Sequence, residues 1–196
     1  MRVEEGELGP ANIYAIIGDG GRERRILRGV AEKYNHSKII RIPRAPITYG
    51  GLTVAIRGLA LLFSKTTVRT YIILIDREHV NNLEQVEEKL KEHGFTIQEH
   101  QTLHEGCWKI IVKRDGDEKA TIYIAVQGHK KSIEENLAQL IKLYGEQVES
   151  DKKAVQDWLR KHGKSDYDLI KEALKENLEK AFPQLTKALE ELTKDP

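Results

Sequence analysis

Two apolar stretches of this sequence each lead into acidic side chains, and these acids are the residues best suited to do chemistry. Residues 13–17 are followed by a glycine and Asp19, and residues 71–75 are followed by Asp76 and Glu78. Short apolar runs bounded by turn residues are typical of buried strands. At the carboxyl ends of parallel strands, side chains face the crevice where α/β proteins bind ligands. Because Mg²⁺ and Mn²⁺ prefer oxygen ligands, the pattern predicts a metal site at Asp19, Asp76 and Glu78.

The segment after Asp19 adds a second acid at the start of a helix. Gly20 and Gly21 predict a tight turn, and the apolar spacing over residues 22–34 predicts a helix with Glu23 in its first turn. Glu23 follows Asp19 by four residues, so we expect both carboxylates near the junction of strand and helix. We take Asp19 and Glu23 as the candidate catalytic pair.

Arginines around the same turn make it a candidate phosphate-binding segment. The first 69 residues contain twelve basic and six acidic residues, although the net charge of the whole chain is only +1. A guanidinium contacts phosphate through two parallel hydrogen bonds. The alternative is that the arginines pair with acidic residues elsewhere in the chain. The residues expected to contact phosphate or nucleic acid are Gly20, Gly21, Arg22, Arg24 and Arg25.

Other kinds of site fit this sequence poorly. The dinucleotide-binding fingerprint needs glycine at its first, third and sixth positions. Gly18 and Gly20 match the first two, but Glu23 stands at the sixth and would repel a pyrophosphate. No lysine follows the glycines as it does in a P-loop. The single cysteine, Cys107, excludes an internal disulfide and a cysteine-rich zinc site, and the histidines lack the spacing of zinc ligands.

The composition indicates a globular chain outside the membrane. Hydrophobic residues make up 39% and charged residues 32% of the 196 residues. No apolar run approaches the roughly 20 residues that cross a bilayer, and the first residues lack the apolar core of a signal peptide. We therefore expect a cytoplasmic protein without membrane association. The many charges and the single cysteine suit a thermophile.

The order of the predicted elements favours an α/β fold. Strands and helices alternate through the first half, and an Asp-Gly turn within residues 114–117 predicts an antiparallel hairpin. The remainder is helical, with Pro183 expected to kink or break the last helix. We predict a mostly parallel central sheet flanked by helices, with that hairpin and a C-terminal helical extension. The predicted strands are 12–18, 38–43, 68–75, 95–99, 107–113 and 121–126, and the predicted helices are 22–34, 50–64, 82–93, 132–144, 151–162 and 166–194.

Three segments are expected along the chain. Residues 1–11 form a flexible lead-in, residues 12–128 an α/β domain, and residues 129–196 a helical extension that packs on this domain or extends from it. An apolar stripe at helical spacing predicts either core packing or an interface with a second copy of the chain or with a protein partner. The stripe consists of Leu169, Ala173, Leu174, Leu178, Phe182, Leu185, Leu189 and Leu192.

Residues 16–27 and 76–78 resemble the two motifs of the TOPRIM (topoisomerase/primase) domain. The first motif is an apolar strand that ends in an acid and a glycine, followed by a second acid and an apolar helix; here the acids are Asp19 and Glu23. The second is acid-x-acid after an apolar strand, here Asp76-Arg77-Glu78. The resemblance covers about residues 12–128. The helical extension is similar in placement to that of single-domain, nuclease-like members related to the overcoming-lysogenization-defect (OLD) nucleases.

The resemblance implies a central four-stranded parallel sheet and a Mg²⁺-dependent site for phosphodiester chemistry. By position, Asp19 would be the general acid/base linked to the metal, and Asp76 and Glu78 would be metal ligands. Asp19 is one methylene shorter than the usual glutamate, and Glu78 is one longer than the usual aspartate. Further acids help to hold a second metal in the OLD-like nucleases. Glu134 and Glu135 are the nearby candidates, either for that role or for a capping box at the start of their helix.

The resulting hypothesis is a Mg²⁺- or Mn²⁺-dependent protein that processes nucleic-acid phosphodiesters, most simply a nuclease, with DNA or RNA as its partner. The alternative is a non-catalytic TOPRIM-like module that binds nucleic acid or a protein, in which the acids serve as structural caps. Convergence of Asp19, Asp76 and Glu78 on one cation would favour the first hypothesis.

Overall fold

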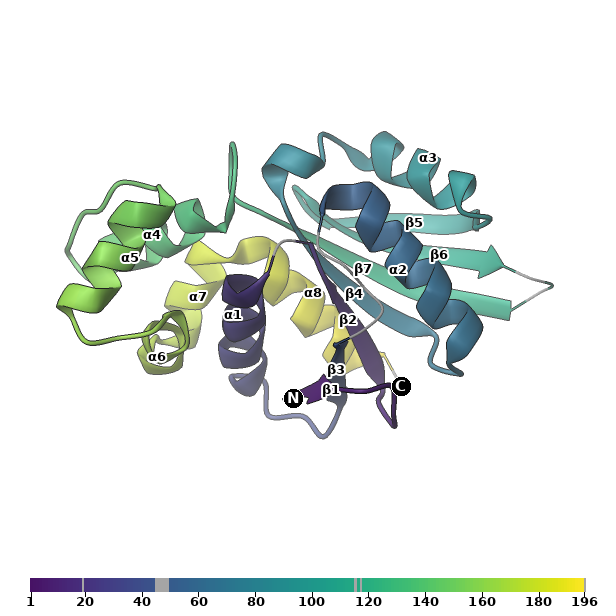
Figure 1. Ribbon diagram of the computed structural model, residues 1–196, viewed down its shortest axis with the longest axis horizontal. Helices are drawn as coiled ribbons and strands as arrows, with labels where there is room; N and C mark the ends of the chain where they lie inside the picture. The colour runs from purple at the N-terminus through teal and green to yellow at the C-terminus, as the bar shows by residue number, and fades with distance from the viewer. Residues whose placement is uncertain (19, 45–49, 115, 117, 196) are drawn as a thin grey trace.

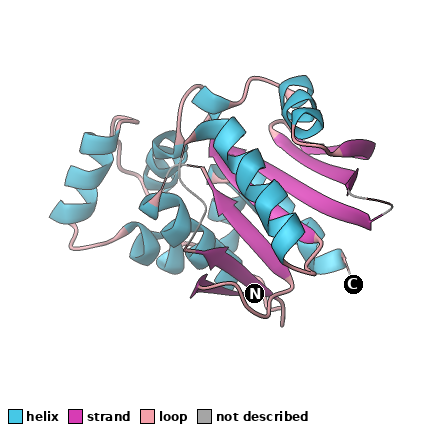
Figure 2. Cartoon of the chain, turned by 45° about the vertical axis from the view of Figure 1, so that its right-hand side comes forward, coloured by secondary structure: helices cyan, strands magenta, loops and turns pink. Residues whose placement is uncertain are grey.

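The computed structural model describes residues 1–18, 20–44, 50–114, 116 and 118–195. Asp19, predicted to be catalytic and metal-binding, lies outside the described residues, as do Asp115 and Asp117 of the predicted hairpin turn. The described chain forms an α/β fold in which helices cover both faces of a mostly parallel sheet (Figure 1; Figure 2). The predicted fold class is confirmed at this level.

The sheet contains seven described strands in the order β1-β3-β2-β4-β7-β6-β5. The first five in this order run parallel, and β6 and β5 continue the sheet as antiparallel strands. The sheet therefore has one parallel strand, β1, beyond the four that the resemblance implied. The strands are β1 (Arg2–Gly6), β2 (Ile13–Ile17), β3 (Ile39–Pro43), β4 (Thr70–Asp76), β5 (Thr96–His104), β6 (Cys107–Arg114) and β7 (Glu118–Gln127).

Helices fill the connections between the first strands and make up most of the chain after the sheet. In the part of the chain that the structure describes, no helix is both long and apolar enough to cross a bilayer. The helices are α1 (Gly21–Glu32), α2 (Gly51–Lys65), the short 3₁₀ helix η1 (Arg77–His79), α3 (Leu83–Glu92), α4 (Ile133–Leu143), α5 (Lys152–Lys161), α6 (Asp166–Glu172), α7 (Lys175–Ala181) and α8 (Pro183–Lys194).

Successive residues of the central strands face two separate apolar cores. Ile13, Ala15 and Ile17 of β2 belong to the core that contains residues of α1 and α8. Tyr14 and Ile16 belong to the core that contains residues of α2 and α3. This alternation follows from the pleat of the strand. Because both faces are covered by helices, the central strands are continuous apolar runs, the pattern from which they were predicted.

The prediction of a flexible lead-in was wrong for residues 2–6. They form β1, which pairs in parallel with β3 from Arg2 opposite Ile39 to Gly6 opposite Pro43. The terminal ammonium of Met1 also donates hydrogen bonds to the carbonyl oxygens of Ala31 and Tyr34 at the end of α1. The short, charged strand lacks an apolar run because it lies at the edge of the sheet, where burial is incomplete.

The helical extension returns to the sheet through α8. Figure 1 shows α4, α5 and α6 gathered to one side, while α8 lies along the sheet on the face that it shares with α1. The single predicted helix over residues 166–194 is three helices. Pro183 breaks it as predicted and is the first residue of α8, but a second break lies at Ala173 and Leu174, where the backbone is extended.

The apolar stripe of the extension is core. Of its eight residues, seven are buried in the core beside α1, and only Leu174 is exposed. The final turn is fixed by Asp195, whose carboxylate accepts hydrogen bonds from Lys109 Nζ at 2.8 Å and Tyr123 Oη at 2.5 Å. The core interpretation is therefore confirmed for these seven residues. A second copy or a protein partner bound through the C-terminal helices stays a prediction.

Gly29 allows α1 and α6 to approach closely. A Cβ atom at this position would lie 2.6 Å from Cγ2 and 3.0 Å from Cβ of Ile170, a side chain of α6. These atoms sit on the stiff, branched part of isoleucine, so they cannot move aside by a rotation of a flexible chain end. The absence of a side chain at Gly29 thus sets the distance between α1 and the helical extension.

We expect Gly29→Ala to lower the free energy of unfolding by about 1–3 kcal/mol, the usual cost of overpacking a well-packed contact. Chemical denaturation of both proteins measures this difference. Gly6→Ala is the matched control, because nothing lies within 4 Å of a Cβ at Gly6. Equal stability of the two variants would contradict the close contact.

Candidate metal and phosphate site

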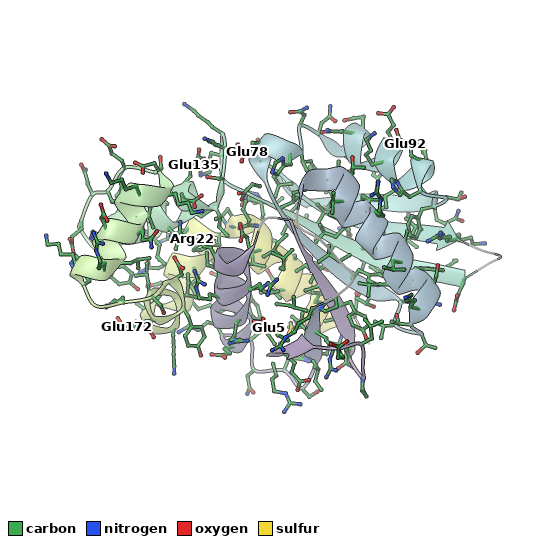
Figure 3. All side chains as sticks on the ribbon, in the orientation of Figure 1. Glu5, Arg22, Glu78, Glu92, Glu135 and Glu172 are labelled. Atoms are coloured by element: carbon green, nitrogen blue, oxygen red, sulfur yellow. The ribbon has the colours of Figure 1, made fainter. Side chains whose placement is uncertain are left out.

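A cavity of about 950 Å³ lies where the carboxyl end of β4 meets α1 and the helical extension. Figure 3 labels two residues at its edge, Arg22 on α1 and Glu78 after β4. The described residues around it include equal numbers of acids and bases. The acids are Glu23, Asp76, Glu78, Glu134, Asp151 and Asp166, and the bases are Arg22, Arg25, Lys131, Lys152, Arg160 and Lys164.

Asp76 is the last residue of β4, and the alternation along that strand directs it toward the extension. Ile72 and Leu74 face the core beside α1, so Asp76 follows them on the same face. Its side chain is nearly buried, with 6% of its surface exposed. The carboxylate Oδ1 accepts a hydrogen bond of 3.0 Å from the backbone N–H of Ile133, the first residue of α4. Asp76 thus joins the sheet to the extension.

Glu78 lies in η1, directly after the strand, and is exposed. Its backbone N–H donates a 2.9 Å hydrogen bond to the carbonyl oxygen of Lys131. Asp76 and Glu78 do not project from one extended segment, because β4 ends at Asp76 and η1 begins at the next residue. The fold nevertheless brings both carboxylates to the same cavity.

Glu23 completes the set of predicted acids that the structure describes. It lies in the first turn of α1, is 5% exposed and lines the cavity with Asp76 and Glu78. Three of the four predicted acids are therefore gathered around one space, and Asp19 lies outside the described residues. Among the described residues, no three His, Cys, Asp or Glu side chains form a group that could by itself hold a metal ion.

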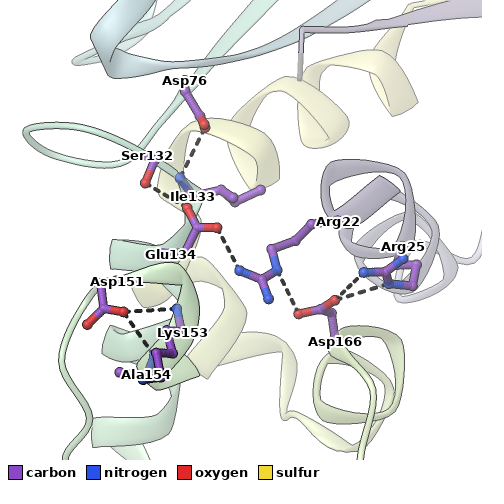
Figure 4. A network of polar contacts seen from close by, with 10 residues as sticks. All are labelled: Arg22, Arg25, Asp76, Ser132, Ile133, Glu134, Asp151, Lys153, Ala154 and Asp166. Atoms are coloured by element: carbon purple, nitrogen blue, oxygen red, sulfur yellow. Dashed lines mark hydrogen bonds and ion pairs between the residues drawn. The ribbon is translucent and has the colours of Figure 1, made fainter. Parts of the chain in front are cut away.

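The arginines predicted to bind phosphate are instead held in ion pairs. Arg22, with a side chain only 12% exposed, places Nη1 2.6 Å from Glu134 Oε1 and Nε 3.1 Å from Asp166 Oδ1. Arg25 donates to Asp166 Oδ2 through Nε at 3.0 Å and Nη2 at 2.7 Å. Figure 4 shows this network joining α1 to α4 and α6. The alternative that the arginines pair with distant acids is confirmed for this pair of residues.

The remaining residues predicted to contact phosphate differ in whether they line the cavity. Gly21 lines the cavity, but Gly20 and Arg24 are not among the described residues that do. Arg24 Nη1 lies 3.4 Å from Glu5 Oε2 on β1. A helix that starts at Gly21 turns successive side chains by about 100°, so Arg24 faces away from its neighbours Arg22 and Arg25.

Asp166, the residue that binds both arginines, was not recognised in the sequence. Its side chain is 4% exposed. It begins α6, and Ser165 and Asp168 form a capping box there. The local sequence around Asp166 therefore indicates only the start of a helix. Its pairing partners lie more than 140 residues earlier in the chain, and no local pattern predicts such a contact.

Glu134 and Glu135 do not form the expected capping box. Ser132 Oγ donates to Glu134 Oε2 at 2.6 Å. The Ser132 side chain does not cap the first turn of α4. Glu135 accepts from the backbone N–H groups of residues 129, 130 and 131. Burial alone would raise the pKa of Glu134, but hydrogen bonds from Ser132 and from its own backbone N–H, together with the charge of Arg22, hold that pKa below its ordinary value.

No model of a protein family, no curated protein and no solved structure matches this chain. The resemblance to the TOPRIM domain therefore stays an expectation.

We expect Asp166→Asn to lower the free energy of unfolding by on the order of 3 kcal/mol, because removing one partner of a buried ion pair leaves the other charge uncompensated. Urea denaturation measures the change. Asp157→Asn is the control, since Asp157 forms an exposed pair with Arg160 and such pairs contribute little. A similar effect of both substitutions would show that the buried network does not support the fold.

Glu134 predicts a pH dependence of stability. A carboxyl group with a lowered pKa in the folded state stabilises the fold fully above its ordinary value of 4.5, and this contribution is lost as the pH falls through the lower folded value. Wild type should therefore be more stable than Glu134→Gln at pH near 7, and the difference should shrink below about pH 4.5. Denaturation curves across this range test the sign. A difference that grows in acid would contradict it.

Proposed function

We propose that this protein is a Mg²⁺- or Mn²⁺-dependent enzyme that processes nucleic-acid phosphodiesters, a nuclease-like protein of the TOPRIM type. The observation that carries the proposal is the gathering of Glu23, Asp76 and Glu78 around one cavity. These residues come from the two segments that resemble the TOPRIM motifs. Carboxylates from a strand end and a neighbouring helix are also a common way to hold a hard cation.

The donor set suits magnesium or manganese even though it is small. Mg²⁺ is commonly held by one or two carboxylates, with water and substrate phosphates completing its shell. Asp76 and Glu78 would be those carboxylates. When bound, the ion would neutralise charge on a phosphodiester and make a water molecule more acidic.

The chain's own residues prepare this site in three ways. The hydrogen bond from Ile133 N–H fixes Asp76 Oδ1, so that the carboxylate keeps one orientation. Glu78 lies exposed at the cavity and is accessible to a substrate. Glu23 is nearly buried and lines the same cavity. We assign Glu23 the task of exchanging a proton with the substrate or with water.

A second candidate is a TOPRIM-like module that binds without catalysis. The hydrogen bond between Asp76 and Ile133 favours it, because the same contact caps the first turn of α4 and would be kept after catalysis was lost. This candidate predicts that the cavity residues stabilise the fold but bind no divalent cation.

The double variant Asp76→Asn, Glu78→Ala separates the two candidates. Asparagine keeps a carbonyl oxygen that can accept the Ile133 N–H, so the cap is retained while the charge is lost. We expect affinity for Mn²⁺ to fall on the order of 100-fold or more, since losing even a partner of a metal ligand costs roughly 10–100-fold. Calorimetric titration of Mn²⁺ and Mg²⁺ measures this, with cleavage of single- and double-stranded DNA and RNA followed in parallel.

Glu88→Ala is the matched control, because it removes an exposed acid on α3 that does not line the cavity. It should bind metal and cleave as wild type does. A wild-type protein that binds neither cation would reject the enzymatic proposal and favour the binding module.

A further inference from the structure

The bases around the cavity fall into two groups that differ in how firmly they are already held. Arg22 and Arg25 on α1 are bound to Glu134 and Asp166, which are largely buried. Freeing either arginine for a phosphate would leave a buried carboxylate without its partner, which is strongly unfavourable. These two arginines are therefore committed to the fold.

The other four bases come from the helical extension and are held less firmly or not at all by ion pairs. Lys131 and Lys152 are exposed and form no ion pair with any residue that the structure describes. Arg160 is paired with Asp157 at 2.8 Å and Lys164 with Glu172, and both pairs are at the surface. Exposed pairs of this kind contribute little and exchange partners readily.

The remaining acids of the cavity come from both the extension and the α/β part of the chain. Asp151 accepts hydrogen bonds of 2.9 Å from the backbone N–H groups of Lys153 and Ala154, so its Oδ1 caps α5. Glu23, Asp76 and Glu78 come from α1 and from the residues at the end of β4. The cavity thus receives three acids from α1 and the end of β4, and from the extension it receives four bases that are outside the buried ion pairs.

We propose that the helical extension holds the phosphate backbone of single-stranded nucleic acid, through Lys131, Lys152, Arg160 and Lys164, while Glu23, Asp76 and Glu78 in the same cavity face the scissile phosphate. This inference deepens the proposed function and rests on it. The volume of about 950 Å³ is in the range of small-ligand sites, roughly 300–1,000 Å³. A space of this size admits a few nucleotides of one strand and is too small for a duplex.

Binding of a short fluorescent oligothymidylate, in EDTA so that no cleavage occurs, tests the proposal. We expect Lys131→Ala, Lys152→Ala to weaken binding about tenfold and to lower the slope of log K against log salt by about 1.4, at roughly 0.7 for each lost contact with a single strand. The same measurement with a duplex of equal length should give weaker binding by wild type.

Lys153→Ala, Lys161→Ala is the matched control. It removes the same charge from two exposed lysines of α5 that do not line the cavity, and it should leave binding of the oligothymidylate unchanged. Equal losses in both double variants would mean that only net charge matters and would overturn the proposal. Tighter binding of the duplex, or unchanged binding by Lys131→Ala, Lys152→Ala, would overturn it as well.

The metal titration distinguishes this inference from the function on which it rests. A protein that binds Mn²⁺ and cleaves a small phosphodiester such as bis(p-nitrophenyl) phosphate, but binds no strand, would reject the role of the extension and keep the metal site. A protein that binds the strand through Lys131 and Lys152 but no cation would reject the enzymatic function and keep the nucleic-acid surface.

Discussion

The contacts of Arg22 with Glu134 and Asp166 are the interaction on which the arrangement of this protein depends. One guanidinium on α1 binds a carboxylate from α4 and another from α6, and Arg25 strengthens the second contact. The pairs are largely buried. Buried charges attract each other strongly, and a buried charge without its partner is costly. They fix the extension against the first helix of the α/β unit, and the cavity is the space that remains beside them.

Around this network, the sheet and the extension form one apolar structure. The core beside α1 contains residues of β2, β4, α4, α7 and α8, so the extension is packed on the sheet through the same side chains that stabilise the sheet. Gly29 permits the close contact of α1 with α6. The packing of the extension on the sheet and on α1 therefore sets the position of the basic residues on α5.

The charged residues that line the cavity determine which ligands suit it. Carboxylates and cations that line one cavity suit a substrate that carries negative charge and recruits a cation. Committing two arginines to buried acids keeps the site rigid, and it leaves the exposed lysines of the extension to meet a ligand. Rigid support of a site by a surrounding shell is a general requirement for precise chemistry.

The sequence by itself determined the strands other than β1, most helices, and the places of Glu23 in the first turn of a helix and of Asp76 and Glu78 after a strand, because each depends on local patterns. Tertiary contacts brought these three acids to one cavity. Apolar runs, glycine turns and helical spacing are set by neighbours along the chain. Tertiary structure alone decided that β1 joins the sheet edge, that Ala173 and Leu174 interrupt a helix, and that Arg22 and Arg25 bind Asp166 rather than a ligand. These outcomes depend on partners brought together from distant parts of the chain, and burial of one partner determines the strength of the contact.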